Sequence, residues 1–120
     1  MKRTLVIGAS ENPERYSYKA INALRSHGHE VFAIGGRPGT VANVSFDQEM
    51  KTFEQIDTVT LYVGPKNQPV FYNYILKLNP RRVIFNPGTE NPELQDMLMA
   101  AGIFPEIACT LVLLSTGQYE

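Results

Sequence analysis

The fold of this chain is decided by the stretch LVIGASENPERYS, residues 5–17. Its aliphatic start predicts a strand, Gly8 and Ala9 predict a tight turn, and a helix is expected to follow with Ser17 as its N-cap. Small residues let the backbone approach a ligand, and the unpaired N–H groups at a helix start attract an anion. We therefore expect a phosphate-binding loop here, although any βα turn favours small residues and the full G-x-G-x-x-G pattern is absent.

Apolar segments of strand length alternate with segments whose apolar residues recur at helical spacing, and no hairpin signal lies between them. Asn91, Pro92 and Glu93 give the clearest helix start, as cap, first residue and first-turn acid. This alternation predicts an α/β fold, Rossmann-like and doubly wound, with a mostly parallel five- to six-stranded sheet and helices on both faces. We expect strands at residues 4–7, 30–34, 57–63, 82–86 and 103–107, and helices from Ser17 to Gly28, over 68–78 and from Asn91 to Gly102, in a single domain of residues 1–120.

Three segments have weaker patterns. Residues 41–46 suggest a short edge strand, and Glu49, Met50 and Phe53 suggest a brief helical turn. Residues 108–115 are apolar enough to form either a covering helix or a further strand. These segments leave the number of strands open between five and six.

The size and charge of the chain limit the classes of partner that it is expected to bind. With 120 residues and a formal net charge of -1, the chain has no basic field to hold a nucleic-acid backbone, so we expect no nucleic-acid partner. The single cysteine, Cys109, excludes an intramolecular disulfide and is expected to be an inert core thiol. No apolar run approaches the roughly 20 residues that cross a bilayer. We expect a cytoplasmic protein with no membrane partner, and no metal site because neither histidine lies near an acidic cluster.

The ends of the expected strands differ strongly between the two edges of the sheet. In doubly wound sheets a ligand binds beyond the carboxyl ends of the strands, where the winding reverses. Small or polar residues follow each of these ends, whereas the opposite edge has ordinary turns. The segments at the carboxyl ends are Gly8-Ala9-Ser10, Gly35-Gly36-Arg37, Val63-Gly64-Pro65 and Asn86-Pro87-Gly88. This asymmetry predicts a binding crevice without depending on any one motif.

Arg37 narrows the kind of ligand. NAD-binding folds usually place an acidic residue after the second strand, where it binds the ribose hydroxyls. This chain has Arg37 there, and a guanidinium suits a ribose that carries a phosphate. Two common ligands fit, NADP with its 2′-phosphate and coenzyme A with its 3′-phosphate, while a solvated loop arginine is the plain structural alternative.

The chain offers no set of catalytic residues. Tyr62 and Lys66 have the Tyr-x-x-x-Lys spacing of some reductases, but that pair works from one face of a helix, and here it spans a strand end and Pro65. His27 and His29 flank a helix stop at the opposite edge of the sheet. We expect a binding protein without catalysis of its own, and keep a small NADP-binding oxidoreductase, or a subunit of one, as the alternative.

Several short motifs of the chain occur together in one protein family. They are Gly8-Ala9-Ser10, Asn12-Pro13-x-Arg15-Tyr16-Ser17, Gly28-His29-x-Val31, Gly35, Val63-x-Pro65 and Asn86-Pro87-Gly88. As a set they resemble the small stand-alone CoA-binding domain proteins, which are similar to the N-terminal CoA-binding domain of the succinyl-CoA synthetase α subunit. The resemblance covers about residues 3–110, and the Gly-Ala-Ser-x-x-Pro-x-Arg-x-Ser pattern is its most specific part because ordinary Rossmann dehydrogenases lack it.

The resemblance implies that coenzyme A, free or acylated, lies across the carboxyl edge of the sheet as a small-molecule nucleotide ligand. Its phosphates are expected near Ser10, Arg15 and Ser17, and its adenosine end near Arg37. The open edges of such a sheet also suggest a homodimer. The expected cofactor-binding residues are Gly8, Ala9, Ser10, Asn12, Pro13, Arg15, Tyr16, Ser17, Gly35, Gly36, Arg37, Val63, Gly64, Pro65, Gln68, Asn86, Pro87 and Gly88.

Overall fold

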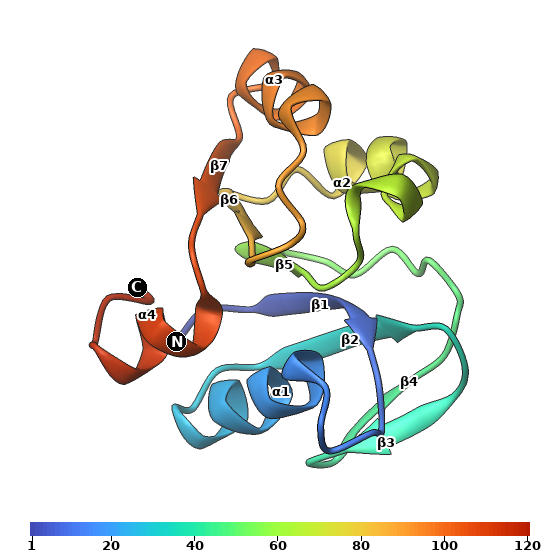
Figure 1. Ribbon diagram of the computed structural model, residues 1–120, viewed down its shortest axis with the longest axis vertical. Helices are drawn as coiled ribbons and strands as arrows, with labels where there is room; N and C mark the ends of the chain where they lie inside the picture. Colours follow the sequence, from blue (N-terminus) through green and yellow to red (C-terminus); the bar gives the residue numbers. More distant parts are fainter.

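A five-stranded parallel sheet forms the centre of the molecule, in a computed structural model that describes all residues from Met1 to Glu120. In spatial order its strands are β2 (Val31–Gly35), β1 (Thr4–Ala9), β5 (Thr58–Leu61), β6 (Arg82–Phe85) and β7 (Phe104–Ile107) (Figure 1). Counted along the chain, this is the doubly wound order 2-1-3-4-5, in which the winding reverses between β1 and β5. The predicted Rossmann-like doubly wound α/β fold is confirmed, with five strands in the main sheet.

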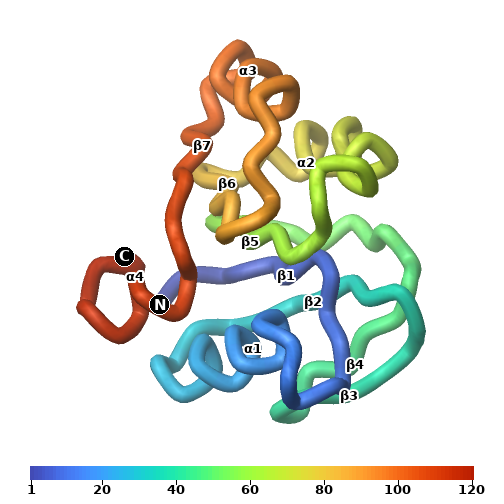
Figure 2. Tube along the Cα trace, in the orientation of Figure 1, coloured from blue at the N-terminus to red at the C-terminus, as the bar shows by residue number.

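Helices cover both faces of this sheet. Figures 1 and 2 show α1 (Tyr16–Ser26) and α4 (Thr110–Ser115) on one side, and α2 (Tyr72–Leu78) and α3 (Pro92–Ala100) on the other. Each side has its own apolar core, because successive residues of a strand point to opposite faces. No helix of the structure is long and apolar enough to span a membrane.

The face of β5 and β6 that lies toward α4 contains buried polar side chains beside the apolar Ile84. Val59 and Val83 point toward α2 and α3, whereas Thr60 lies on the α4 side, where its hydroxyl is 2.8 Å from that of Thr110. Asn86 donates to the same Thr60 hydroxyl at 2.7 Å. Buried polar groups are tolerated only when they are hydrogen-bonded, so these contacts fix α4 against the sheet.

A hairpin stands between β2 and β5, where the sequence analysis expected a single edge strand. β3 (Gly39–Val41) and β4 (Val44–Phe46) pair antiparallel in a sheet of their own. Ala42 and Asn43 form the two-residue turn with φ of 49° and 66°, the left-handed conformation that such hairpins need. The sequence showed no clear hairpin signal here, because Asn43 was the only turn residue and alanine rarely adopts this conformation, so the single edge strand expected at 41–46 is corrected to a hairpin.

Other helix boundaries also differ from the expected ones. The N-cap of α1 is Arg15 rather than Ser17, and no side chain caps this helix. In place of the expected helix over 68–78, the chain forms the short helix η2 (Pro69–Phe71) followed by α2, because proline interrupts the helical hydrogen bonds, and a further short helix η1 (Pro65–Asn67) precedes them. Residues 47–55 contain no helical turn. The cap at Asn91 is confirmed, since its side chain accepts a hydrogen bond from the Leu94 N–H at 3.4 Å.

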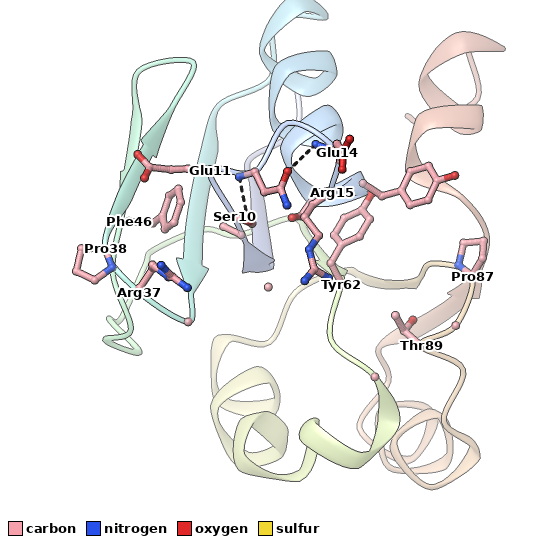
Figure 3. A pocket seen from close by; sticks show the side chains of 18 residues that line it. Ser10, Glu11, Glu14, Arg15, Arg37, Pro38, Phe46, Tyr62, Pro87 and Thr89 are labelled. Atoms are coloured by element: carbon pink, nitrogen blue, oxygen red, sulfur yellow. Dashed lines mark hydrogen bonds between the residues drawn. The ribbon is translucent and has the colours of Figure 1, made fainter.

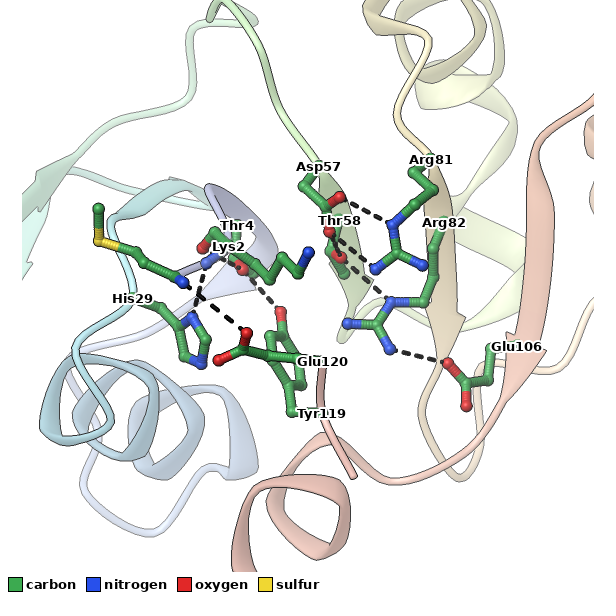
Figure 4. A network of polar contacts seen from close by, with 11 residues as sticks. Lys2, Thr4, His29, Asp57, Thr58, Arg81, Arg82, Glu106, Tyr119 and Glu120 are labelled. Atoms are coloured by element: carbon green, nitrogen blue, oxygen red, sulfur yellow. Dashed lines mark hydrogen bonds and ion pairs between the residues drawn. The ribbon is translucent and has the colours of Figure 1, made fainter. Parts of the chain in front are cut away.

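Side chains from the C-terminal segment fill the amino edge of the sheet (Figure 4). Tyr119 is buried, and its hydroxyl is 2.6 Å from that of Thr4. Arg82 is also buried, lies over the Tyr119 ring at 4.5 Å and pairs with Glu106 at 3.0 Å. Because this edge is packed, open space for a ligand is found at the opposite, carboxyl edge.

Candidate ligand site at the carboxyl edge

A cavity of about 730 Å³ opens at the carboxyl ends of β1 and β5, where the winding of the sheet reverses (Figure 3). The loop from β1 to α1 forms one wall, the hairpin β3–β4 forms a second, and the segments after β5 and β6 form a third. The lining comprises Gly8, Ala9, Ser10, Glu11, Asn12, Glu14, Arg15, Tyr16, Ser17, Gly36, Arg37, Pro38, Phe46, Tyr62, Gly64, Pro87, Gly88 and Thr89.

The cavity brings together most of the residues that the sequence analysis expected to bind a cofactor. The expected residues in its lining are Gly8, Ala9, Ser10, Asn12, Arg15, Tyr16, Ser17, Gly36, Arg37, Gly64, Pro87 and Gly88. Those outside the lining are Pro13, Gly35, Val63, Pro65, Gln68 and Asn86. Those that the sequence analysis missed are Glu11, Glu14, Pro38, Phe46, Tyr62 and Thr89. Glu11 and Glu14 lie inside the recognised loop, whereas nothing in the local sequence around Phe46 pointed to a ligand.

Gly8 lets the end of β1 turn into the cavity wall. Its φ is 102°, and the register of β1 against β2 is irregular between Ile7 and Ala9. A Cβ at this position would lie 2.8 Å from the backbone oxygen of Tyr62, so only glycine fits without a shift of the backbone. This close approach joins β1 to the end of β5 at the floor of the cavity.

The loop after Gly8 is held by its own hydrogen bonds. The Ser10 hydroxyl accepts from the Asn12 N–H at 3.0 Å, and the Asn12 side chain accepts from the Glu14 N–H at 3.0 Å. The Asn12 carbonyl accepts from the Arg15 N–H at 3.0 Å. The loop therefore has a fixed shape, and it delivers the start of α1 to the cavity, where Tyr16 and Ser17 form part of the lining.

The start of α1 carries the features of an anion site. It has no side-chain cap and no acidic residue in its first turn, so its unpaired N–H groups keep their positive partial charge. Arg15 and Arg37 line the same cavity, and neither side chain forms an ion pair or a hydrogen bond within the protein. Figure 3 shows Arg37 beside the hairpin and Arg15 near the middle of the lining. Two guanidiniums without a protein partner are available to bind phosphate groups.

Tyr62 contributes an apolar wall rather than a reactive group. Its hydroxyl is buried without a hydrogen-bond partner, while the nearby hydroxyls of Thr60 and Thr110 bind each other at 2.8 Å. Burial raises the pKa of Tyr62 to about 12, so the phenol keeps its proton at neutral pH. Lys66 lies exposed on η1, and the two residues do not share one helix face as a reductase pair does.

Gln68 and Asn86 lie behind the cavity wall and hold its loops in place through hydrogen bonds. Gln68 is fully buried, and its amide nitrogen donates to the carbonyls of Val63 at 3.0 Å and Thr89 at 2.8 Å. The side-chain amide of Asn86 is also buried. Its nitrogen donates to the Leu61 carbonyl at 2.8 Å, and its oxygen accepts from the Thr110 N–H at 2.9 Å. Because their polar atoms are already bonded, these two residues shape the loops instead of facing the cavity.

The cavity contains no histidine or cysteine. Cys109 is partly buried at the start of α4 and lies outside the lining, and His29 is buried at the amino edge of the sheet. No group of three His, Cys, Asp or Glu side chains is placed to hold a metal ion. The titratable groups of the lining are two carboxylates, two guanidiniums and two phenols.

The fold and the cavity define a doubly wound α/β protein with a cleft at the carboxyl edge of its sheet, lined by two unpaired arginines and the uncapped start of α1. A family model described as a CoA binding domain matches residues 2–115. The chain therefore belongs to the CoA binding domain family, which confirms the resemblance found in the sequence, and this membership supports coenzyme A binding in general.

Solved structures share the fold over almost the whole chain. An uncharacterized protein of known crystal structure is 52% identical, with a TM-score of 0.96 and 98% of each chain covered. A hypothetical protein from Pyrococcus horikoshii OT3 is 24% identical with a TM-score of 0.86, covering 96% of this chain and 82% of its own. A Thermus thermophilus protein is 21% identical with a TM-score of 0.86, covering 98% of this chain and 90% of its own. Comparison with curated protein sequences gives no match.

Proposed function

We propose that this protein binds coenzyme A, as the free thiol or as an acyl thioester, in the cavity at the carboxyl edge, without catalysing a reaction of its own. The observation that carries the proposal is the pair of unpartnered guanidiniums, Arg15 and Arg37, beside the uncapped start of α1. Coenzyme A has phosphates at two separated places, the diphosphate and the 3′-position of the ribose. Two separate cationic groups in one cavity match that distribution.

The charge of the cavity supports one orientation of the ligand. The diphosphate is placed at the start of α1, with Ser10, Arg15 and Ser17 around it, where the helix N–H groups favour negative charge. The 3′-phosphate and adenosine then lie toward Arg37 and the hairpin. The pantetheine arm runs past Tyr62 between the segments after β5 and β6. The hydrogen bonds from Gln68 to Val63 and Thr89 fix the distance between those segments before a ligand binds.

The absence of a catalytic role rests on the composition of the lining. A hydride-transfer enzyme needs a proton donor held beside its substrate, and besides the two guanidiniums the lining offers two exposed carboxylates, the exposed phenol of Tyr16 and the phenol of Tyr62, whose hydroxyl is buried. The NADP-binding oxidoreductase remains the alternative because Arg37 could also bind a 2′-phosphate. Loss of nicotinamide absorbance with a panel of carbonyl substrates would support that alternative.

Titration calorimetry with coenzyme A, dephospho-CoA and NADP tests the proposal. We expect coenzyme A to bind most tightly and to raise the melting temperature, because a ligand that binds only the folded state stabilises it. Dephospho-CoA should bind more weakly, since it lacks the 3′-phosphate. No heat and no thermal shift with millimolar coenzyme A, or tighter binding of NADP, would overturn the proposal.

We also propose a homodimer, as the sequence analysis suggested. β2 and β7 are the edge strands of the sheet, and β7 exposes Phe104 and Ile107. Pro105 lacks an N–H group, which weakens pairing of β7 with another strand, so side-chain packing is the expected contact. Light scattering with and without coenzyme A measures the oligomeric state, and a monomer under both conditions would contradict this part of the proposal.

A further inference from the structure

Glu11 is one of two acidic residues in the loop that carries Arg15, and its side chain extends toward the hairpin. Its carboxylate accepts a hydrogen bond from the backbone N–H of Thr40 at 2.8 Å. Figure 3 shows the side chain extending from the β1–α1 loop toward the hairpin, away from Arg15. A negative charge beside bound phosphates is unfavourable, so a glutamate in this loop needs a structural reason.

The reason lies in the packing between the loop and the hairpin. A Cβ on Gly39 would lie 2.7 Å from Glu11 Cγ and 2.9 Å from the ring of Phe46, so both side chains lie against Gly39 and a larger residue there would displace at least one of them. A Cβ on Gly35 would likewise lie 2.8 Å from the Phe46 ring. Phe46 is only 6% exposed, yet its ring forms part of the cavity wall. Glu11 and two glycines thus enclose the ring that faces the ligand.

Hydrogen bonds join the hairpin to the rest of the molecule on two sides. On the β2 side, Gly35 donates to the Asp47 carbonyl at 3.0 Å, and the Gln48 side chain donates to the Gly36 carbonyl at 2.7 Å. On the side of the phosphate loop, the Glu11–Thr40 bond is the only hydrogen bond to the hairpin. Val41, Val44 and Phe46 are also buried in the apolar core, so this contact is the one polar link that joins the phosphate loop to a hairpin already packed on that core.

We propose that Glu11 is a positioning residue that fixes the hairpin against the phosphate loop, so that the wall for the adenosine end of the ligand is formed before binding. The inference rests on the proposed function and adds to it the residue that joins the phosphate end of the cavity to its nucleoside end. Preorganisation of this kind raises affinity by removing the ordering of a loop from the cost of binding. Loss of the Glu11 contact therefore weakens the binding of ligands that contain adenosine, and does not change the affinity for ligands that have only the pantetheine and phosphate parts.

Binding of two fragments of coenzyme A tests this role. Adenosine 3′,5′-bisphosphate contains the nucleoside end, and 4′-phosphopantetheine lacks it. Glu11→Ala should weaken the bisphosphate about fivefold, the effect of one hydrogen bond of about 1 kcal/mol, and leave 4′-phosphopantetheine within about twofold. Glu11→Gln keeps an acceptor oxygen of the same reach, so it should restore bisphosphate binding. Because Glu11 is exposed, both variants are expected to fold.

Glu14→Ala is the matched control. Glu14 lies in the same loop and lines the same cavity, but its carboxylate has no hydrogen-bond partner. Its removal takes away one negative charge without touching the hairpin, so it should leave both fragments bound equally well or more tightly. The amide resonance of Thr40 gives a second readout, which should shift in Glu11→Ala and stay in place in Glu14→Ala.

Three outcomes would contradict either the positioning role of Glu11 or the proposed function. If the unsubstituted protein binds coenzyme A but Glu11→Ala behaves like Glu14→Ala with both fragments, Glu11 has no positioning role and the proposed function stands. If the unsubstituted protein binds neither coenzyme A nor its fragments, the proposed function itself fails. An unchanged Thr40 resonance in Glu11→Ala would also overturn the inference, because the hydrogen bond would then not hold the hairpin.

Discussion

The amide nitrogen of Gln68 donates a hydrogen bond of 2.8 Å to the carbonyl oxygen of Thr89, joining the segments after β5 and β6 across the end of the sheet. The same nitrogen donates to Val63, and the amide oxygen of Gln68 accepts from Asn91 at 2.9 Å. A single buried side chain thus sets the separation of two loops that border the cavity.

Gln68→Ala should therefore lower the free energy of unfolding by about 1–3 kcal/mol, because it leaves a buried donor and buried acceptors without partners. Coenzyme A binding should weaken as well, since the two loops lose the hydrogen bonds that join them through Gln68. Chemical denaturation measures the first effect and calorimetry the second. Gln118→Ala, at an exposed position, is the control and should change stability by less than about 0.5 kcal/mol. Equal stability of the two variants would contradict the role given to Gln68.

Substitution of Gly8 by alanine is expected to destabilise the fold by at least about 1 kcal/mol. Its positive φ disfavours any side chain, and the added Cβ would lie 2.8 Å from the Tyr62 oxygen. Gly64→Ala is the matched control, because its φ is -67° and a Cβ there meets nothing within 4 Å. That variant should be stabilised by about 0.4–1 kcal/mol through a less flexible unfolded chain. Urea denaturation of both variants checks the opposite signs.

Arg37→Ala should weaken coenzyme A by about 1.5–3 kcal/mol and leave dephospho-CoA nearly unchanged, if the guanidinium binds the 3′-phosphate. Arg15→Ala should weaken both ligands, because the diphosphate is common to them. Arg25→Ala, an exposed arginine in the last turn of α1, controls for the loss of one positive charge. Titration calorimetry with the two ligands measures all three variants. Equal losses of both ligands in Arg37→Ala would remove Arg37 from the 3′-phosphate.

The stability of the protein should fall as the pH drops below about 6.5, with His29 as one cause. Burial lowers the pKa of His29 from its usual 6.5, and its ring Nδ1 accepts a hydrogen bond from the Lys2 N–H at 2.8 Å. Below pH 6.5 the unfolded chain gains a proton at this residue before the folded protein does, so folding loses free energy there. Above that pH both states are neutral and the contribution is constant.

Urea denaturation of the unsubstituted protein and of His29→Gln, at about pH 7.5 and at about pH 5.5, isolates this contribution from that of the carboxylates. The variant should lose less stability between the two pH values than the unsubstituted protein. His27→Gln is the control, because His27 is exposed on the same turn. A pH dependence that is unchanged in His29→Gln would show that the buried imidazole does not contribute.

Local sequence was sufficient to predict the parts of the fold that depend on neighbouring residues. The turn that begins at Gly8 and the helix start at Asn91 depend on chemistry that acts within a few residues, through φ preference, capping and the absence of an N–H group in proline. The alternation of such segments then determined the parallel sheet, because parallel strands need long crossover connections. The sheet in turn placed the candidate site at its carboxyl edge.

Only the tertiary structure decided the contacts between segments distant in the chain. Gln68 appeared to be a ligand residue in the sequence, but its two bonds to Val63 and Thr89 occupy it inside the protein. Phe46 entered the cavity wall because the hairpin folds back on Gly35 and Gly39. The sequence by itself determined the doubly wound sheet and the loop of Gly8 and Arg15, since local preference and strand pattern suffice for both. Which side chains face the cavity was decided by packing across the fold, because a side chain that finds a buried partner is no longer available to a ligand.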